Sequence, residues 1–330
     1  MTQFPKNFEK IVESVKTMEI RGAGEIARSA AEALLLVAES SKAETVNEFV
    51  DDLDRAARSL LKTRPTAVSL PNSVRYVMKR VLDAKSSALK IDELRNVTID
   101  AAKKFIENSK NAVKKIGEIG SKRIQDGDLL LTHCNSTAAL AIILRAWEDG
   151  KQIKVFATET RPLFQGRTTA KILDRAGVPV TLIVDSAVRY FMPKIDKVVV
   201  GADAVAANGA VVNKIGTSMV ALAAHEARVL FFVAAETYKF SPETMLGELV
   251  LIEERDVAEV VPADVLKGFR KLNVRNPSFD VTPPEYIDLI VTERGVIPPQ
   301  GALSILQTEF GWMSLEELQQ YQTYAKLEEE

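Results

Sequence analysis

Two side chains that could exchange protons with a small substrate follow apolar runs of this sequence. Cys134, the single cysteine, comes after the run at residues 128–132 (DLLLT) and before a helix-like stretch that starts near Ser136. Asp203 comes after the run at residues 197–201 (KVVVG). Such runs are typical of buried strands, and ligands bind at the carboxyl ends of strands in open α/β sheets. The sequence therefore predicts a thiol and a carboxyl group at neighbouring strand ends, where they can act as base and acid on one substrate.

Each of these two residues also has a structural alternative. A free cysteine is often a small buried side chain, and an aspartate after a strand is often a helix cap or a turn residue. The helix after Cys134 favours the thiolate, because its first N–H groups and the positive end of its dipole face the thiol. A carboxyl group in an apolar setting has a raised pKa and can donate a proton near neutral pH. The pairing of the two residues favours the functional interpretation.

Several segments combine a cation with glycine and could bind an anion. Residues 213–217 (NKIGT) join a lysine, a glycine and a helix start, and residues 21–24 (RGAG) place an arginine and two glycines before a long helix. Phosphate binds to backbone N–H groups at helix starts and to nearby cations. Both segments could also be plain helix starts, and Arg64 and Lys239 are of residue types that usually lie on the surface.

The elements that position these groups fall into two parts of different periodicity. Up to residue 122 the pattern is almost entirely helical, over residues 23–40, 44–62, 73–82 and 91–119. From residue 128, short apolar runs alternate with helical patterns, at residues 128–132, 154–158, 180–184, 197–201, 229–234 and 288–293. This alternation is typical of βαβ units. We predict an α/β protein with an all-helical N-terminal domain, residues 1–122, and a Rossmann-like domain, residues 123–330, with a mainly parallel, doubly wound sheet.

Composition and charge restrict the class of protein. The 330 residues are 46% hydrophobic and 27% charged, as in globular proteins with one large or two medium cores. A net charge of −2 argues against nucleic acid as a partner, since phosphate-backbone binding needs a basic surface. No membrane-spanning run or signal peptide is recognisable, so we expect a cytoplasmic protein. One cysteine and two histidines argue against a zinc site, and His133 and His225 are interpreted as structural.

Five motifs occur in an order that indicates a family. They are THCNST from residue 132, TETRPLFQG from 158, GADAVAANG from 201, NKIGT from 213 and VAAETYKFSP from 233. Together with RGAG at residue 21 and RPTAV at residue 64, they resemble the superfamily of methylthioribose-1-phosphate isomerases, ribose-1,5-bisphosphate isomerases and the regulatory subunits of translation initiation factor 2B. The resemblance covers nearly the whole chain. It implies a helical domain, a Rossmann-like domain and a homo-oligomer based on dimers, with a hexamer as one option.

The resemblance also implies an enzyme and its substrate. Enzymes of the superfamily carry the Cys/Asp pair, whereas the initiation-factor subunits generally lack one or both residues, and Cys134 and Asp203 are both present. RGAG at residues 21–24 and the sequence at residues 135–137 (NST) resemble archaeal ribose-1,5-bisphosphate isomerases. Polar groups there suit a 5-phosphate, whereas a methylthio group needs an apolar slot. We expect isomerisation of α-D-ribose 1,5-bisphosphate to D-ribulose 1,5-bisphosphate, in a breakdown of nucleoside monophosphates that feeds Rubisco.

A mechanism follows from these assignments. We assign Asp203 as the acid toward the ring oxygen and Cys134 as the base at C2, with a direct hydride shift from C2 to C1 as the open alternative. The substrate-binding residues implied by the family are Arg21, Gly22, Ala23, Gly24, Arg64, Ser136, Thr137, Ala138, Asn213, Lys214 and Lys239. No metal or organic cofactor is implied. Three other functions stay open: a methylthioribose-1-phosphate isomerase of methionine salvage, a non-catalytic subunit of the initiation-factor type, and a sensor that binds sugar phosphate or nucleotide without converting it.

Overall fold

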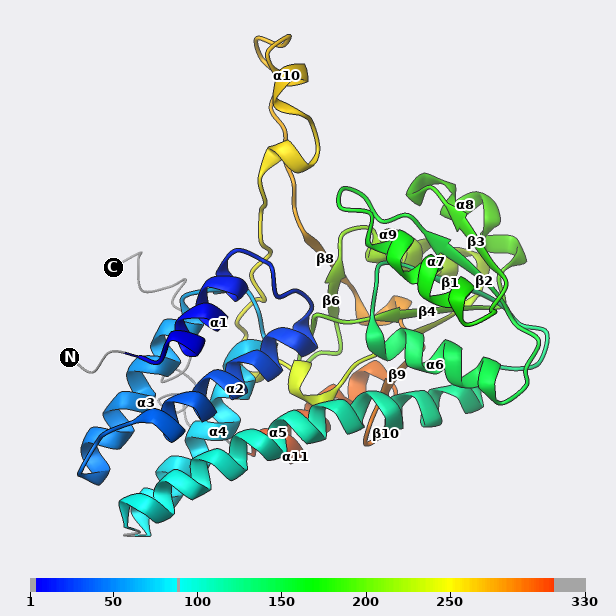
Figure 1. Ribbon diagram of the computed structural model, residues 1–330. Helices are drawn as coiled ribbons and strands as arrows, with labels where there is room; N and C mark the ends of the chain where they lie inside the picture. Colours follow the sequence, from blue (N-terminus) through cyan, green and yellow to red (C-terminus); the bar gives the residue numbers. More distant parts are fainter. Residues whose placement is uncertain (1–3, 88–89, 312–330) are drawn as a thin grey trace. The chain divides into compact units, whose positions relative to one another are not determined.

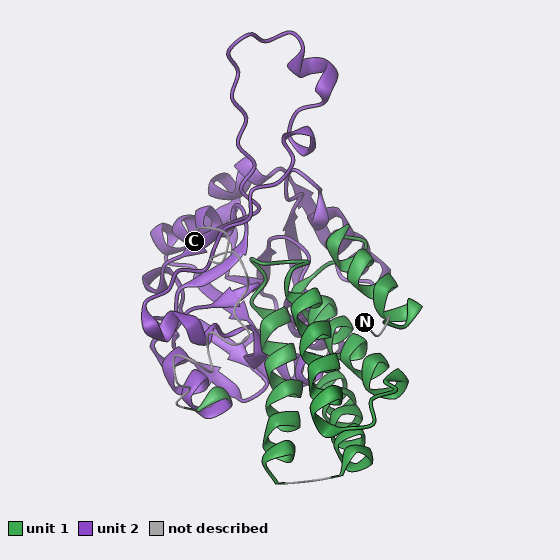
Figure 2. Cartoon of the chain, turned by 90° about the vertical axis from the view of Figure 1, so that its left-hand side faces the viewer, with its two compact units in different colours: residues 1–111, 310–330 green, residues 112–309 purple. Residues whose placement is uncertain are grey.

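The computed structural model describes residues 4–87 and 90–311 (Figure 1). Figure 2 shows two compact units, residues 1–111 with 310–330 and residues 112–309, and each is described by itself below. Along the described ranges, no helix is both long and apolar enough to cross a membrane. The domain limits at residues 122 and 123 stay a prediction.

The first unit is built from helices, as the periodicity predicts. They are α1 (Lys6–Lys16), α2 (Ala23–Ser40), α3 (Val46–Leu61), α4 (Ser69–Ser86) and the first part of α5 (Ile91–Gly120). A capping box begins α3: the Thr45 hydroxyl accepts the N–H of Glu48, and the Glu48 carboxylate accepts the N–H of Thr45. Large apolar side chains from these helices, among them Leu34, Phe49 and Met78, are fully buried and form the core of the unit.

The second unit contains a seven-stranded sheet in the order β10-β9-β7-β4-β1-β2-β3. Its strands are β1 (Leu129–Thr132), β2 (Lys154–Thr158), β3 (Val180–Ile183), β4 (Lys197–Gly201), β7 (Leu230–Ala234), β9 (Leu289–Thr292) and β10 (Gly295–Ile297). All pairs are parallel except that of β9 with the edge strand β10. The six parallel strands follow the Rossmann order, in which the direction of strand addition reverses between β1 and β4. The predicted mainly parallel sheet is confirmed.

Helices connect these strands and cover the sheet. They are α6 (Thr137–Glu148), α7 (Gln165–Arg175), the short α8 (Val188–Phe191) and α9 (Thr217–Ala227). Two further helices are α10 (Ala263–Leu266), which lies far from the sheet in Figure 1, and α11 (Ala302–Phe310), which follows the last strand. Right-handed crossovers place α6 and α7 on one face of the sheet and α9 on the other. The core on the α6 face joins Ile116 of α5 to Ile142 and Ile143 of α6 and to Val155 and Val199 of the strands.

A second sheet, antiparallel and three-stranded, follows β4 and is absent from the sequence prediction. It has the order β5-β6-β8, with strands β5 (Ala204–Val205), β6 (Val211–Lys214) and β8 (Phe279–Thr282). The N–H of Ala206 donates to the carbonyl of Ala210, which closes the turn between β5 and β6. Because β5 is two residues long and β8, the second partner of β6, is distant in sequence, no local pattern reveals the sheet.

Residues 247–278, which connect the 3₁₀ turn ending at Leu246 to β8, form an arm whose outer part, with α10, extends away from both sheets (Figures 1 and 2). At its base the N–H of Arg255 donates to the Asn276 carbonyl at 3.0 Å, and the N–H of Ser278 donates to the Glu253 carbonyl at 2.8 Å. Further out, the guanidinium of Arg161 donates to the Val260 carbonyl at 3.2 Å. The arm is therefore continuous with β8 and its base is held by backbone hydrogen bonds.

Candidate functional site

Cys134 and Asp203 lie at the point where the strand order of the large sheet reverses. β1 and β4 are hydrogen-bonded neighbours, with Leu131 opposite Val198, and each of the two residues follows its strand by two positions. A Cβ atom at Gly201 would lie 2.3 Å from the Ser136 hydroxyl oxygen, so the loop after β1 packs directly on the end of β4. The switch point of such a sheet is where its ligands bind.

Two threonines hold the backbone of Cys134 in a left-handed conformation. Cys134 has φ +68°, which is uncommon for a residue with a side chain. Its N–H donates to the hydroxyl of Thr160, after β2, at 2.9 Å, and its carbonyl accepts from the hydroxyl of Thr169, in α7, at 2.8 Å. The thiol is thus presented from a loop whose backbone is fixed by its neighbours.

Burial and nearby charges set the ionisation of the thiol. Burial raises the pKa of Cys134 to about 11, the positive charge of Lys214 acts against this, and the negative charge of Asp203 adds to it. Lys214 is 6% exposed, its ammonium lies 4.6 Å from the centre of the Phe279 ring, and burial lowers its pKa. Cys134, Asp203 and Lys214 are therefore close enough to act on one another electrostatically, as the sequence predicts for a shared site.

Asn213 and Lys214 end strand β6 rather than begin a helix. The Asn213 amide donates to the Thr217 hydroxyl at 3.0 Å, and that hydroxyl donates to the Lys214 carbonyl at 2.6 Å. The start of α9 is occupied by the Asp280 carboxylate, which accepts the N–H groups of Gly216 at 2.7 Å and Ser218 at 3.1 Å. The Asp280 carboxylate therefore accepts hydrogen bonds from the N–H groups that the sequence analysis proposed as phosphate ligands.

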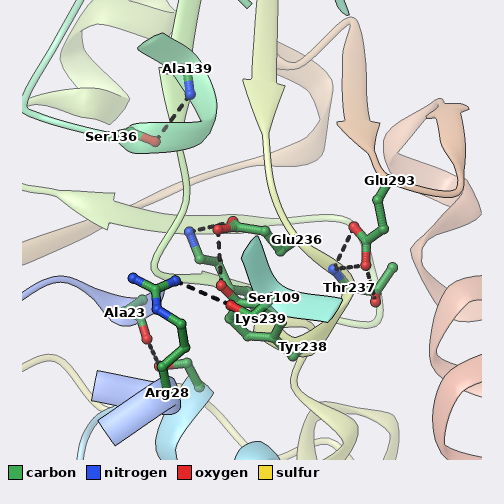
Figure 3. A network of polar contacts seen from close by, with 11 residues as sticks. Ala23, Arg28, Ser109, Ser136, Ala139, Glu236, Thr237, Tyr238, Lys239 and Glu293 are labelled. Carbon is green, nitrogen blue, oxygen red and sulfur yellow. Dashed lines mark hydrogen bonds and ion pairs between the residues drawn. The ribbon is translucent and has the colours of Figure 1, made fainter. Parts of the chain in front are cut away.

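Ser136, Thr137 and Ala138 form the start of α6. The Ser136 hydroxyl accepts the N–H of Ala139 at 3.3 Å (Figure 3), and the Ser136 carbonyl accepts the N–H of Leu140 at 2.9 Å. Ser136 is thus the N-cap of this helix. The first two N–H groups of the helix belong to Thr137 and Ala138, which are the positions at which helix starts bind anions.

Lys239 takes part in a buried ion pair. Its ammonium lies 2.6 Å from a carboxylate oxygen of Glu236, and the Tyr238 hydroxyl donates to the other oxygen at 3.0 Å (Figure 3). Nearby, Glu293 accepts the N–H and the hydroxyl of Thr237, and burial raises the pKa of Glu293. An anion that binds Lys239 must compete with Glu236 for its charge.

The remaining predicted residues belong to the first unit. Arg21 is exposed and its Nε donates to the Met18 carbonyl at 2.6 Å, while Gly22 (φ +83°) precedes α2. Ala23 and Gly24 are the first residues of α2, and the Ala23 carbonyl accepts the hydroxyl of Ser69 at 2.8 Å. Arg64 is buried. One cation that sequence reasoning missed lies in α2: Arg28 donates to the Ser109 hydroxyl at 3.2 Å (Figure 3).

Sequence reasoning also missed the residues that support Cys134. Thr160 lies in the TETRPLFQG motif, Thr169 lies in α7 and Asp280 lies in β8, and the sequence analysis assigned none of the three a role. His133, interpreted as structural, makes two hydrogen bonds that are described below. Within residues 4–87 and 90–311, no three His, Cys, Asp or Glu side chains gather as a metal site requires.

The fold and the site define a Rossmann-type α/β protein with a thiol, a carboxyl group and a lysine at the switch point of its sheet. Residues 19–299 match the model of the initiation factor 2 subunit family, and the chain belongs to this family.

Two curated relatives and one solved structure show where the chain lies within the family. It is 58% identical to the ribose 1,5-bisphosphate isomerase of Thermococcus kodakarensis over 93% of this chain and 96% of that protein. It is 38% identical to the methylthioribose-1-phosphate isomerase of Pelotomaculum thermopropionicum, over 88% and 83% of the two chains. The translation initiation factor eIF-2B of Pyrococcus horikoshii superposes with a TM-score of 0.75 at 32% identity, over 90% and 98%.

Proposed function

We propose that the protein isomerises α-D-ribose 1,5-bisphosphate to D-ribulose 1,5-bisphosphate. The main support for this proposal is the Cys134/Asp203 pair at the point where the strand order reverses between β1 and β4. The chain that carries this pair is 58% identical to a ribose 1,5-bisphosphate isomerase. Its identity to a methylthioribose-1-phosphate isomerase is lower, at 38%. A role in nucleoside monophosphate breakdown and a cytoplasmic location belong to the same proposal.

The chemistry needs an acid and a base. Asp203 gives a proton to the ring oxygen as the bond from that oxygen to C1 breaks. The Cys134 thiolate takes the proton from C2, which leaves an enediol-type intermediate. A proton added at C1 and the loss of the hydroxyl proton at C2 then give the ketose, with the 1-phosphate retained, so that substrate and product are isomers.

Lys214 has a specific task in this scheme. A thiol with a pKa of about 11 is almost fully protonated at neutral pH, and exclusion of water by a bound substrate disfavours the thiolate further. The positive charge of Lys214 already holds this pKa below the value that burial alone would give, because it stabilises the thiolate directly. We assign Lys214 to this role and, with Asn213, to contact with the sugar.

The phosphate groups need N–H donors and cations. In the second unit we assign Thr137 and Ala138 at the start of α6, with Ser136 as their cap, and Lys239 as a cation released from Glu236. In the first unit, residues 21–24 and Arg64 stay proposed phosphate ligands on the strength of the family resemblance.

A comparison of substrates tests the proposal. We expect kcat/KM for ribose 1,5-bisphosphate to exceed that for 5-methylthioribose 1-phosphate by about 100-fold or more, since a site built for a charged group rejects an analogue that lacks it. A preference for the methylthio sugar would assign the protein to methionine salvage. Turnover of neither would favour a binding protein. In deuterated water, deuterium at C1 of the product supports proton transfer, and its complete absence supports a hydride shift.

We also propose a homo-oligomer built from dimers, with the arm as a contact surface. The first half of the arm is mainly acidic, with Glu248, Glu253, Glu254, Asp256, Glu259 and Asp264 against one arginine, Arg255, and the second half is basic, with Lys267, Arg270, Lys271 and Arg275. Glu253 pairs with Arg255 and Glu254 pairs with Arg275 within the same arm, and Asp264, Lys267, Arg270 and Lys271 are among the charges that meet a partner arm in this proposal. Leu249 and Phe269 are 89% and 57% exposed. Two arms paired antiparallel about a twofold axis would place acidic halves against basic halves and cover the apolar side chains.

Light scattering after gel filtration tests this contact. We expect the wild type to elute as a dimer or a multiple of it, and a Leu249→Asp, Phe269→Asp variant to dissociate. A monomeric wild type, or a variant that keeps the wild-type mass, would contradict the proposed surface.

A further inference from the structure

A continuous chain of hydrogen bonds runs from the backbone of Cys134 to the Asp280 carboxylate. The Cys134 N–H donates to the Thr160 hydroxyl at 2.9 Å, and the hydroxyl oxygens of Thr160 and Thr158 lie 3.3 Å apart. The Thr158 hydroxyl lies 2.7 Å from Nδ1 of His133, and Nε2 of His133 lies 2.9 Å from the Ile215 carbonyl oxygen.

The next link crosses a single peptide group. The carbonyl of Ile215 and the N–H of Gly216 belong to the same peptide bond, and this N–H donates to Asp280 at 2.7 Å. The peptide group is therefore held by His133 on one side and by Asp280 on the other. Gly216 has φ +99°, and a Cβ atom there would lie 3.0 Å from Cε1 of His133, so glycine lets the ring pack against this loop.

The acceptors fix the direction of every donor in the chain. A carbonyl oxygen only accepts, so Nε2 of His133 carries a hydrogen, and burial lowers the pKa of His133, which keeps the ring neutral. Nδ1 then accepts from the Thr158 hydroxyl. The Thr160 hydroxyl accepts from Cys134 and has the hydroxyl oxygen of Thr158 at 3.3 Å and the carbonyl oxygen of Thr158 at 3.4 Å as acceptors. Because Asp280 accepts at the far end, all links point the same way, and such chains strengthen their members.

The held peptide group directly follows Lys214, the cation that acts on Cys134. Lys214 is the last residue of β6, which pairs with β8, where Phe279 faces Lys214 in register and Asp280 is the next residue. His133 directly precedes Cys134. The two ends of the hydrogen-bonded chain are thus next to the thiol and next to its counter-charge.

We infer that His133 and Asp280 are positioning residues that clamp the Ile215–Gly216 peptide group and thereby keep Lys214 beside Cys134. This inference rests on the proposed function, because it assumes that Cys134 is the base of the isomerisation. Neither residue contacts the substrate in this scheme. Loss of either clamp lets the Lys214 loop move, so the thiolate becomes harder to form while the binding groups on α6 remain in place.

The reaction of Cys134 with the neutral disulfide 4,4′-dithiodipyridine tests the clamp without any substrate. Cys134 is the only cysteine, so the released thiopyridone reports this thiol alone. At pH 9 we expect Asp280→Ala and His133→Ala to react about three- to fourfold more slowly than the wild type. A pKa rise of one unit lowers the thiolate fraction about tenfold, and the higher nucleophilicity of the more basic thiolate offsets roughly threefold of this. His133→Gln, whose amide can still donate to Ile215, should recover part of the rate.

Steady-state kinetics on ribose 1,5-bisphosphate separate positioning from binding. We expect kcat to fall about tenfold or more and KM to rise by a smaller factor, because Lys214 and Asn213 also contact the sugar in the proposed scheme. A fall in kcat that exceeds the rise in KM is the pattern of a group that acts mainly on the reacting residue. Asp280→Asn retains an acceptor for Gly216 and provides a milder variant should Asp280→Ala fail to fold.

Matched controls come from the same unit. Asp288 also accepts a backbone N–H, that of Phe231 at 2.7 Å, at the amino end of β7, and His225 packs on Tyr286. Asp288→Ala and His225→Ala should leave the thiol reaction unchanged. Equal rates in all variants would overturn the inference, even if the wild type is an isomerase. Slower reaction in the clamp variants with no isomerase activity in the wild type would support the clamp and refute the proposed function.

Discussion

The ionisation of Cys134 makes a quantitative prediction for the ligand-free protein. With a pKa of about 11, about 0.1% of the thiol is ionised at pH 8, against about 24% of a free cysteine whose pKa is about 8.5. A thiolate of higher pKa is intrinsically more nucleophilic, by roughly 13-fold over this difference. We therefore expect Cys134 to react with 4,4′-dithiodipyridine about 20-fold more slowly than free cysteine at pH 8.

The pH profile of this reaction is the sharper test, because limited access slows the reaction equally at every pH. The rate should rise about tenfold per pH unit from pH 8 to pH 10, without a plateau. Absorbance of the released thiopyridone measures it, with the unfolded protein in urea as the control for a free thiol. A plateau below about pH 9 would refute the reasoning, since it would show a thiol activated before any substrate binds.

Three further predictions concern the groups around the site. Burial raises the pKa of Asp280 to about 6 from 3.8, so the ionisation of Asp280 opposes folding. Relative to Asp280→Asn, the wild type should lose about 2 kcal/mol of unfolding free energy between pH 4.5 and pH 7.5. Urea titrations measure this difference, and a gain in unfolding free energy over the same pH range would contradict the expected sign. Gly216→Ala should lower the unfolding free energy by about 1–2 kcal/mol because alanine is strained in the left-handed backbone of this position, and contact with His133 should lower it further. An unchanged midpoint of unfolding in urea would contradict this prediction. The ammonium of Lys197 lies 2.7 Å from the carboxylate of Asp128, and both side chains are under 10% exposed. Lys197→Met removes the counter-charge of the buried Asp128 and should lower the unfolding free energy by about 3–5 kcal/mol. A decrease below about 1 kcal/mol in the same titration would contradict this prediction.

The large sheet was predictable because its central strands are mostly buried, and β4 is buried along its whole length. The predicted run at residues 197–201 coincides with β4, and that at 154–158 coincides with β2, since continuous apolar stretches between helical patterns are typical of a parallel sheet. The same runs predicted that Cys134 and Asp203 follow neighbouring strands, and the strand order of the sheet shows that β1 and β4 are adjacent.

The support of the site was not predictable, because it depends on partners that are distant in sequence. Asp280 lies 64 residues after Gly216, and Ile215 lies 82 residues after His133. Neither has a local pattern that points to the other. The segment at residues 213–217 was predicted to open a helix, and α9 does begin at Thr217; the sequence did not show that β6 ends at Lys214 or that Asp280 accepts the N–H of Gly216 before the helix.

The most direct test of the account is the product that the protein makes from ribose 1,5-bisphosphate. Wild type, Cys134→Ser and Asp203→Asn should be incubated with the substrate and followed by ³¹P and ¹³C NMR, with thermal unfolding of each variant as the control for folding. We predict that the wild type forms ribulose 1,5-bisphosphate, with a C2 carbonyl and both phosphates retained, and that both folded variants form none at a detectable rate. Full activity in either variant, or an unchanged substrate with the wild type, would contradict the account.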